Sequence, residues 1–428
     1  VTFGGTITQN SANQFKAGSG VTTFNVDPTF TGSGAGGLLF NQNPVTIVSA
    51  RTLTNTYTSG VVTFNALTFA SPTAANNYVV GTGSTTTVTN AITYTANTTA
   101  NNQTITLQGT GILNAGSLNM GAVPTSTGNM LVVTTSATAC TSCQLNVTGL
   151  TTLGNASTAV AGAAQITMTT GATNTFSTGT LTYSTSSTGT GIATLSTATG
   201  TITINGATTF TGAGASAKML LNVTGAGILN LWGTLPTNGT VTLVSTSTTN
   251  MRATASIDAY TFGILNVMTG TTTTTAAVTS AGALTVSDGA TLSLGNFAFT
   301  ASGTTTVGGG TTGILSVAGA GSTGTLTFTG DITVNAGGTF NLSTGTHATS
   351  FAGNIAHNGA TFNTGTGAET FTATKALSGA SNMTFGGAAT INNTFTLTNN
   401  NTATVTFSST IIGSGASGNF ATGLKSYT

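Results

Sequence analysis

Two cysteines three positions apart form the motif with the most definite chemistry in the sequence. Cys140 and Cys143 flank Thr141 and Ser142, and they are the chain's two cysteines. A thioredoxin-like redox centre needs such a pair at the start of a helix, and the flanking residues have no helical pattern. A zinc site would need two further ligands, and the two histidines lie far away in sequence. We expect a short-range disulfide in a surface loop of a secreted protein, with pairing to a neighbouring subunit as the alternative.

The other titratable groups are too few and too dispersed for a catalytic set. His347 and His357 are the two histidines, and a serine nucleophile needs a base that a third group orients. We expect both histidines to be solvated surface side chains. Asp288 and Asp331 stand beside turn glycines, where an aspartate supports turn geometry, and calcium needs several clustered oxygen ligands. The sequence thus predicts no enzyme activity, no cofactor and no metal.

Charge is scarce throughout the chain. Of 428 residues 3% are charged, and six basic and five acidic side chains leave a net charge of +1. No charged residue occurs between Thr52 and Ala217. Nucleic-acid binding requires many phosphate-neutralising cations, so this partner is excluded. Polar residues interrupt each apolar run well before the ~18 residues of a membrane helix, which predicts no membrane span.

Alternation with a period of two residues is the dominant local pattern. It is clear in Thr104–Leu107, Thr201–Ile204 and Thr325–Phe328, where Ile, Leu, Val or Phe would point inward and Thr outward. Good helix formers are scarce, and Gly or Asn bounds most of these segments. The pattern predicts an all-β protein.

Repeats in the second half of the chain indicate how the strands are arranged. Leu284–Leu294 and Ile332–Leu342 each read as strand, glycine turn and strand, and Ile355–Phe362 and Ile202–Phe210 are further copies. A β repeat of about 20–25 residues predicts a β-solenoid, or parallel β-helix, in which stacked coils share one core. Tandem β-sandwich domains are the alternative. We expect a less regular β section able to pair at its end over residues 1–109, and the solenoid over residues 110–428.

Leu284–Leu294 and Ile332–Leu342 resemble the strand repeats of autotransporter passenger domains and filamentous-haemagglutinin-like adhesins. The resemblance covers residues 200–400 best and is otherwise one of composition. It implies a right-handed parallel β-helix exported to the cell surface. The export signal and the C-terminal membrane barrel of that family are not found in this sequence, so the resemblance implies no secretion route.

Asn-x-Ser/Thr sequons are numerous and suit an extracellular protein. The candidate glycosylation sites are Asn97, Asn102, Asn146, Asn155, Asn222, Asn238, Asn341 and Asn382.

The function that fits these features is structural. An uncapped solenoid exposes unpaired strands at its ends and polymerises. We expect a secreted subunit of an extracellular filament or surface sheath whose partners are copies of itself, joined end to end by strand pairing. The alternatives are a monomeric adhesin stalk that binds surface glycans, and an ice-binding solenoid that uses outward Thr columns.

Overall fold

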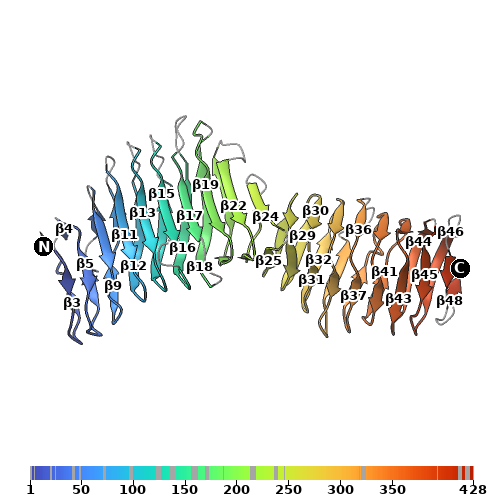
Figure 1. Cartoon of the computed structure of the whole chain (residues 1–428). Helices are drawn as coiled ribbons and strands as arrows, with labels where there is room; N and C mark the ends of the chain where they lie inside the picture. The colour runs from blue at the N-terminus through green and yellow to red at the C-terminus, as the bar shows by residue number, and fades with distance from the viewer. Residues whose placement is uncertain are drawn as a thin grey trace. The chain divides into compact units, whose positions relative to one another are not determined.

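A computed structural model shows an all-β chain in which each pairing between named strands is parallel (Figure 1). It describes residues 2–3, 5–19, 22–24, 26–40, 44–47, 50–70, 74–95, 100–121, 127–134, 140–155, 162–168, 173–186, 188–212, 218–235, 240–244, 246–317, 319, 324–392, 394–412, 417–419 and 425–427. No α-helix occurs among these residues. The parallel β-helix predicted from the repeats is confirmed.

The chain forms two compact units. The first comprises Val1–Asn230 with Pro236–Thr242, and the second comprises Leu231–Leu235 with Leu243–Thr428. The boundary expected at residue 109 falls inside the first unit. There β13 (Gln103–Leu107) pairs with β11 (Asn76–Val80) on one side and β15 (Met130–Thr134) on the other.

Three rows of parallel strands surround the core of the first unit. The first row contains β2 (Ile7–Thr8), β5 (Thr29–Thr31), β8 (Thr52–Asn55), β11, β13, β15, β17 (Ala164–Met168), β19 (Ala193–Thr197) and β22 (Met219–Val223). The second contains β3 (Phe15–Lys16), β6 (Leu38–Phe40), β9 (Val61–Phe64) and β20 (Thr201–Ile204), and the third β1 (Thr2–Phe3), β4 (Thr23–Phe24), β7 (Val45–Ile47), β10 (Leu67–Phe69) and β21 (Thr208–Gly212). Long bent strands belong to the second and third rows together: β12 (Thr85–Tyr94), β14 (Ile112–Met120), β16 (Gln144–Gly154) and β18 (Thr175–Thr185).

The second unit repeats the three-row plan with shorter strands. Its first row contains β25 (Thr248–Met251), β28 (Ile264–Val267), β31 (Leu284–Val286), β34 (Thr305–Val307), β37 (Ile332–Val334), β40 (Ile355–His357), β43 (Lys375–Gly379), β45 (Thr396–Asn399) and β47 (Ser417–Asn419). Its second contains β26 (Ala255–Ile257), β29 (Gly270–Thr274), β32 (Ala290–Leu294), β35 (Ile314–Val317), β38 (Thr339–Asn341), β41 (Thr361–Asn363) and β48 (Lys425–Tyr427). The third contains β27 (Thr261–Phe262), β30 (Val278–Ser280), β33 (Phe299–Ala301), β36 (Leu326–Phe328), β39 (Thr349–Phe351) and β42 (Glu369–Phe371), while β44 (Met383–Ile391) and β46 (Val405–Ile412) bend across two rows. The remaining two strands, β23 (Ile228–Leu231) and β24 (Thr240–Leu243), lie in the part of the sequence where the chain passes between the two units.

Coil length varies along the chain and is greatest in part of the first unit. In the second unit Leu284 pairs with Thr305 and Ile332 with Ile355, as a coil of about 20–25 residues requires. In the first unit Ile112 pairs with Gln144, 32 positions on, because longer connections separate the strands. The number of residues per coil therefore varies along the sequence, although the strands of successive coils remain paired side by side.

Alternation places apolar side chains inside and stacks like on like. Phe340 lies over Phe362 with ring centroids 4.8 Å apart, and Phe385 over Phe407 at the same separation. Asparagines also stack from coil to coil: Asn146 Nδ2 donates to Asn114 Oδ1 at 3.0 Å. Gly337 turns a corner with φ of +72°, in the left-handed region that favours glycine.

Candidate functional site

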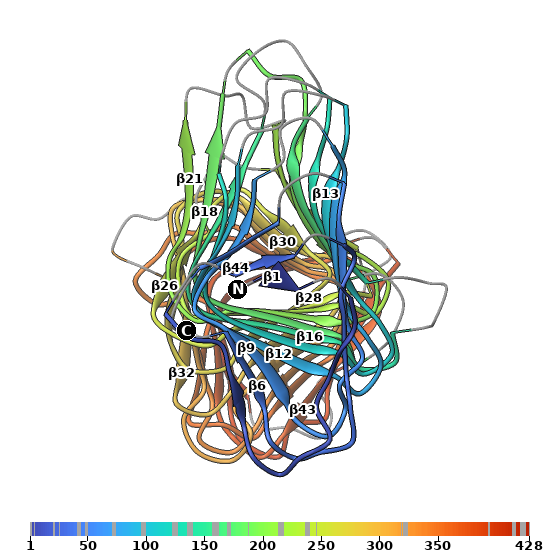
Figure 2. The same cartoon turned by 90° about the vertical axis from the view of Figure 1, so that its left-hand side faces the viewer.

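The first coil of the first unit leaves one side of its strands unpaired. β1, β2 and β3 pair with β4, β5 and β6 respectively, and no described strand lies on their other side. Gln9 N–H donates to Thr31 O at 2.9 Å, so Gln9 faces the second coil and the backbone of its neighbour Thr8 faces away from it. Figure 2 looks onto this first coil. The geometry is that of an edge able to accept another parallel strand.

Aromatic side chains fill the core at this edge. The ring of Phe3 lies 5.6 Å from that of Phe24, 6.1 Å from Phe15 and 6.0 Å from Phe40. Phe24 and Phe40 are buried, whereas Phe3 and Phe15 are half-buried. The hydrophobic core thus reaches the outer side of the first coil, where further apolar contact would stabilise an added coil.

Carboxylates link successive coils. Four of the five acidic side chains accept a backbone N–H from the next coil, namely Asp27 from Thr52 (3.0 Å), Asp288 from Gly309 (2.7 Å), Asp331 from Asn354 (2.7 Å) and Glu369 from Gly387 (3.0 Å). Asp288 and Asp331 were expected to support their own turns. The structure instead directs both to the next coil, because a corner exposes amide groups that no strand partner satisfies.

Asp288 makes the most extensive of these links. Its Oδ1 also accepts from the backbone N–H groups of Gly310 and Thr311, at 3.3 and 3.1 Å. Hydrogen bonds from Gly309, then Thr311, hold the pKa of Asp288 below its ordinary value.

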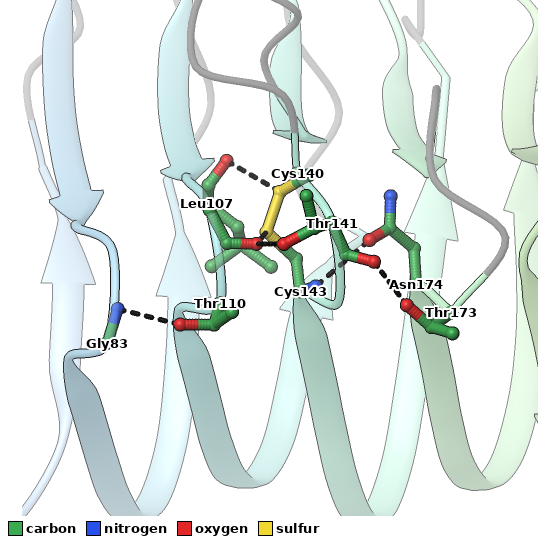
Figure 3. Close-up of a disulfide and its surroundings, with 9 residues drawn as sticks. Gly83, Leu107, Thr110, Cys140, Thr141, Cys143, Thr173 and Asn174 are labelled. Atoms are coloured by element: carbon green, nitrogen blue, oxygen red, sulfur yellow. Dashed lines mark hydrogen bonds between the residues drawn. A yellow bond between two sulfur atoms is a disulfide. The ribbon is translucent and has the colours of Figure 1, made fainter.

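The cysteines form a disulfide at a corner of the first unit (Figure 3). The Cα atoms of Cys140 and Cys143 are 5.5 Å apart. Asn174 Oδ1 accepts the N–H of Cys143 at 2.9 Å from the next coil, and Thr141 N–H donates to Gly109 O of the previous coil at 2.9 Å. Both cysteines are buried, whereas Thr141 between them is exposed, so the two hydrogen bonds hold this surface loop between neighbouring coils.

Both histidines are interior residues, which corrects the expectation that they are solvated. His347 and His357 are at most 1% exposed. His357 pairs in register with Val334, an inward position of β37, and its Nδ1 accepts the N–H of Gly359 at 3.3 Å. Burial lowers the pKa of His357.

Sequence reasoning missed the buried carboxyl of Glu369. It pairs in register with Thr349 and Ala389, both in the core. Thr364 Oγ1 donates to Glu369 Oε1 at 2.5 Å, and Oε2 has no hydrogen-bond partner among the described residues. Burial raises the pKa of Glu369. Its inward place in the alternating segment Ala368–Phe371 was the signal that could have revealed it.

The candidate glycosylation sites differ in accessibility. Asn155 is fully buried and its Nδ2 donates to Gly191 O at 3.1 Å, so the folded chain has no room for a glycan there. Asn102 and Asn382 are exposed. Half-buried positions are Asn146, Asn222 and Asn341, and Asn97 and Asn238 lie outside the described residues.

Two shallow hollows lie on the first unit. One, of about 180 Å³, is lined by Thr167, Met168, Ser196, Thr197, Ala198, Asn222 and Thr224. The other, of about 240 Å³, is lined by Thr87, Val88, Thr89, Asn114, Ala115, Gly116 and Thr148. Neither lining contains a charged or aromatic side chain.

Within the described ranges no three His, Cys, Asp or Glu residues lie close enough together to form a metal site. Within the same ranges no helix is long and apolar enough to cross a bilayer.

Comparisons with known proteins give no relative. No protein-family model, curated protein or solved structure matches the chain. The resemblance to autotransporter passenger domains therefore remains one of repeat pattern alone.

Proposed function

We propose that the chain is a structural subunit of an extracellular filament or surface sheath, and that copies join end to end by β-strand pairing. The observation that carries the proposal is the first coil, whose strands β1, β2 and β3 each pair on one side. β47 and β48 at the other end likewise pair with β45 and β46 alone among the described strands.

Strand direction supports head-to-tail joining. Because the strands run parallel, the last coil of one copy and the first coil of another present strands in the same direction. Such a contact joins two different surfaces, so it repeats from copy to copy and extends a filament unless the rotation between copies closes a ring. The low net charge favours close packing because repulsion between copies is weak.

The disulfide supports an extracellular location. Disulfides persist in oxidising compartments, and Cys140–Cys143 is built into a coil corner.

The test blocks the open edge with one substitution. Thr8→Pro removes a backbone N–H that points away from the second coil, and so prevents strand addition without removing an existing ladder bond. Thr8→Val retains that N–H and is the matched control. In sedimentation velocity the wild type and Thr8→Val should form long assemblies that Thr8→Pro does not. A chain that stays monomeric at every concentration would instead favour the adhesin stalk.

A further inference from the structure

The corner that follows β40 brings together the groups with which an asparagine side chain can react with its own backbone. His357, Asn358 and Gly359 follow one another there. In an Asn-Gly pair the backbone nitrogen of the glycine approaches the side-chain amide with little hindrance, because glycine has no Cβ. His357 is buried, whereas Asn358 is exposed to solvent. The reacting amide is therefore open to water, and the histidine beside it is held in the core.

His357 contacts the nucleophile of this reaction. The backbone N–H of Gly359 donates to His357 Nδ1 at 3.3 Å. A ring nitrogen that accepts a hydrogen bond carries no proton, so Nδ1 directs a free lone pair at this N–H. A general base must lie within hydrogen-bond reach of the proton that it removes. Burial also lowers the pKa of His357, which favours the neutral, basic form of the ring at neutral pH.

The next coil holds the electrophile. Asn358 Oδ1 accepts the backbone N–H of Ala380 at 3.0 Å. The same N–H donates to His357 O at 3.1 Å, so Ala380 binds both the side chain of the asparagine and the backbone just before it. A donor on the amide oxygen stabilises the negative charge that develops there when the amide carbon is attacked, as in an oxyanion hole.

We propose that Asn358 is a site of self-catalysed deamidation in which His357 is the general base. The backbone nitrogen of Gly359 attacks Cγ of Asn358, and its proton passes through His357 Nδ1 to the side-chain nitrogen. The bond from Cγ to that nitrogen breaks, ammonia leaves, and a cyclic succinimide joins the two residues. Water reaches this exposed corner and opens the ring at either carbonyl, which leaves aspartate or isoaspartate at position 358.

Asn205 provides a matched control within the same chain. It is also exposed, it follows the strand β20, and it precedes Gly206. The residue before it is Ile204, which has no basic group. Its side chain is held through the nitrogen, because Asn205 Nδ2 donates to Thr178 O at 3.2 Å. Folding should therefore accelerate deamidation at Asn358 relative to Asn205.

Peptide mapping by mass spectrometry measures the two rates in one sample. The folded full-length protein is incubated at neutral pH, and the fraction of aspartate plus isoaspartate is followed at positions 358 and 205. We expect position 358 to convert at least about tenfold faster, since general base catalysis contributes factors of this size or more. The same incubation in urea should bring the two rates together, because unfolding removes the hydrogen bonds to Gly359 and Asn358.

A variant tests the role of the histidine. His357→Leu removes the base and keeps a buried apolar side chain of similar size. It should lower the rate at position 358 towards that at position 205, and leave the rate at 205 and the circular dichroism spectrum unchanged. If this variant does not fold, the comparison of the two positions in folded and unfolded wild type still tests the proposal.

Two results would overturn the proposal. One is equal rates at positions 358 and 205 in the folded wild type. The other is an unchanged rate at position 358 in folded His357→Leu, which would make the histidine a packing residue only. Neither result depends on filament formation, which Thr8→Pro tests separately.

Discussion

Asp288 Oδ1 lies 2.7 Å from the backbone nitrogen of Gly309, which is 21 positions later and one coil further along the stack. The pair illustrates how this chain uses its few charges: a carboxylate satisfies amide groups at a corner where strand pairing stops. We expect Asp288→Ala to lower the Tm at neutral pH. Asp258→Ala should lower the Tm by less, because Asp258 accepts a hydrogen bond from the backbone N–H of Ala259 in its own coil.

The contribution of Asp288 should depend on pH. Its pKa is lower in the folded chain than in the unfolded chain, so the stabilisation is present above the unfolded pKa of about 3.9 and is lost as the pH falls through the folded pKa. The Tm difference between wild type and Asp288→Ala should therefore shrink in acid. A difference that is constant with pH would show that ionisation plays no part.

Glu369 should have the opposite pH dependence. Its pKa is raised by burial, so its contribution is fully present below the unfolded pKa of about 4.3 and declines as the pH rises through the folded pKa. Glu369→Gln keeps an acceptor for Gly387 N–H and cannot ionise. Thermal unfolding from acidic to mildly alkaline pH should show the wild type losing stability relative to this variant. Parallel curves would contradict the buried placement of the carboxyl.

Gly337 should tolerate no side chain. At its φ of +72° a residue with a Cβ is strained by roughly 1–2 kcal/mol, and an added Cβ would lie 1.5 Å from Thr311 O. We expect Gly337→Ala to reduce the free energy of unfolding by at least that amount in denaturant titrations. Gly310→Ala is the control, since nothing lies within 4 Å of its Cβ position. Equal effects of the two substitutions would refute this account of the corner.

Removal of the disulfide should have a modest effect. The bond closes a very short loop, for which the chain-entropy model gives only about 2 kcal/mol. Cys140→Ser/Cys143→Ser should lower the denaturation midpoint by a corresponding amount and leave the circular dichroism spectrum unchanged. A loss of the β signal would mean that this corner is needed for the coil to form at all.

The sequence revealed those features that depend on local alternation. Leu284–Leu294 reads as strand, glycine turn and strand, and the structure places β31, the left-handed Gly289 and β32 there. The link from Asp288 to Gly309 could not be predicted because it depends on coil register. That register varies: Leu284 pairs 21 positions on with Thr305, which pairs 27 positions on with Ile332.

The histidines and Glu369 were missed for a different reason. In β40 and β42 the first and third side chains point inward, so His357 and Glu369 are core residues despite their polarity. The polarity of these side chains indicated a surface location, but their positions in the strands place them in the core.

Electron microscopy of the purified protein over a range of concentrations shows whether copies join end to end. We expect unbranched filaments that lengthen with concentration, with strands perpendicular to the axis and a continuous repeat of ~4.8 Å across subunit junctions. Single short rods at the highest concentration would contradict end-to-end assembly.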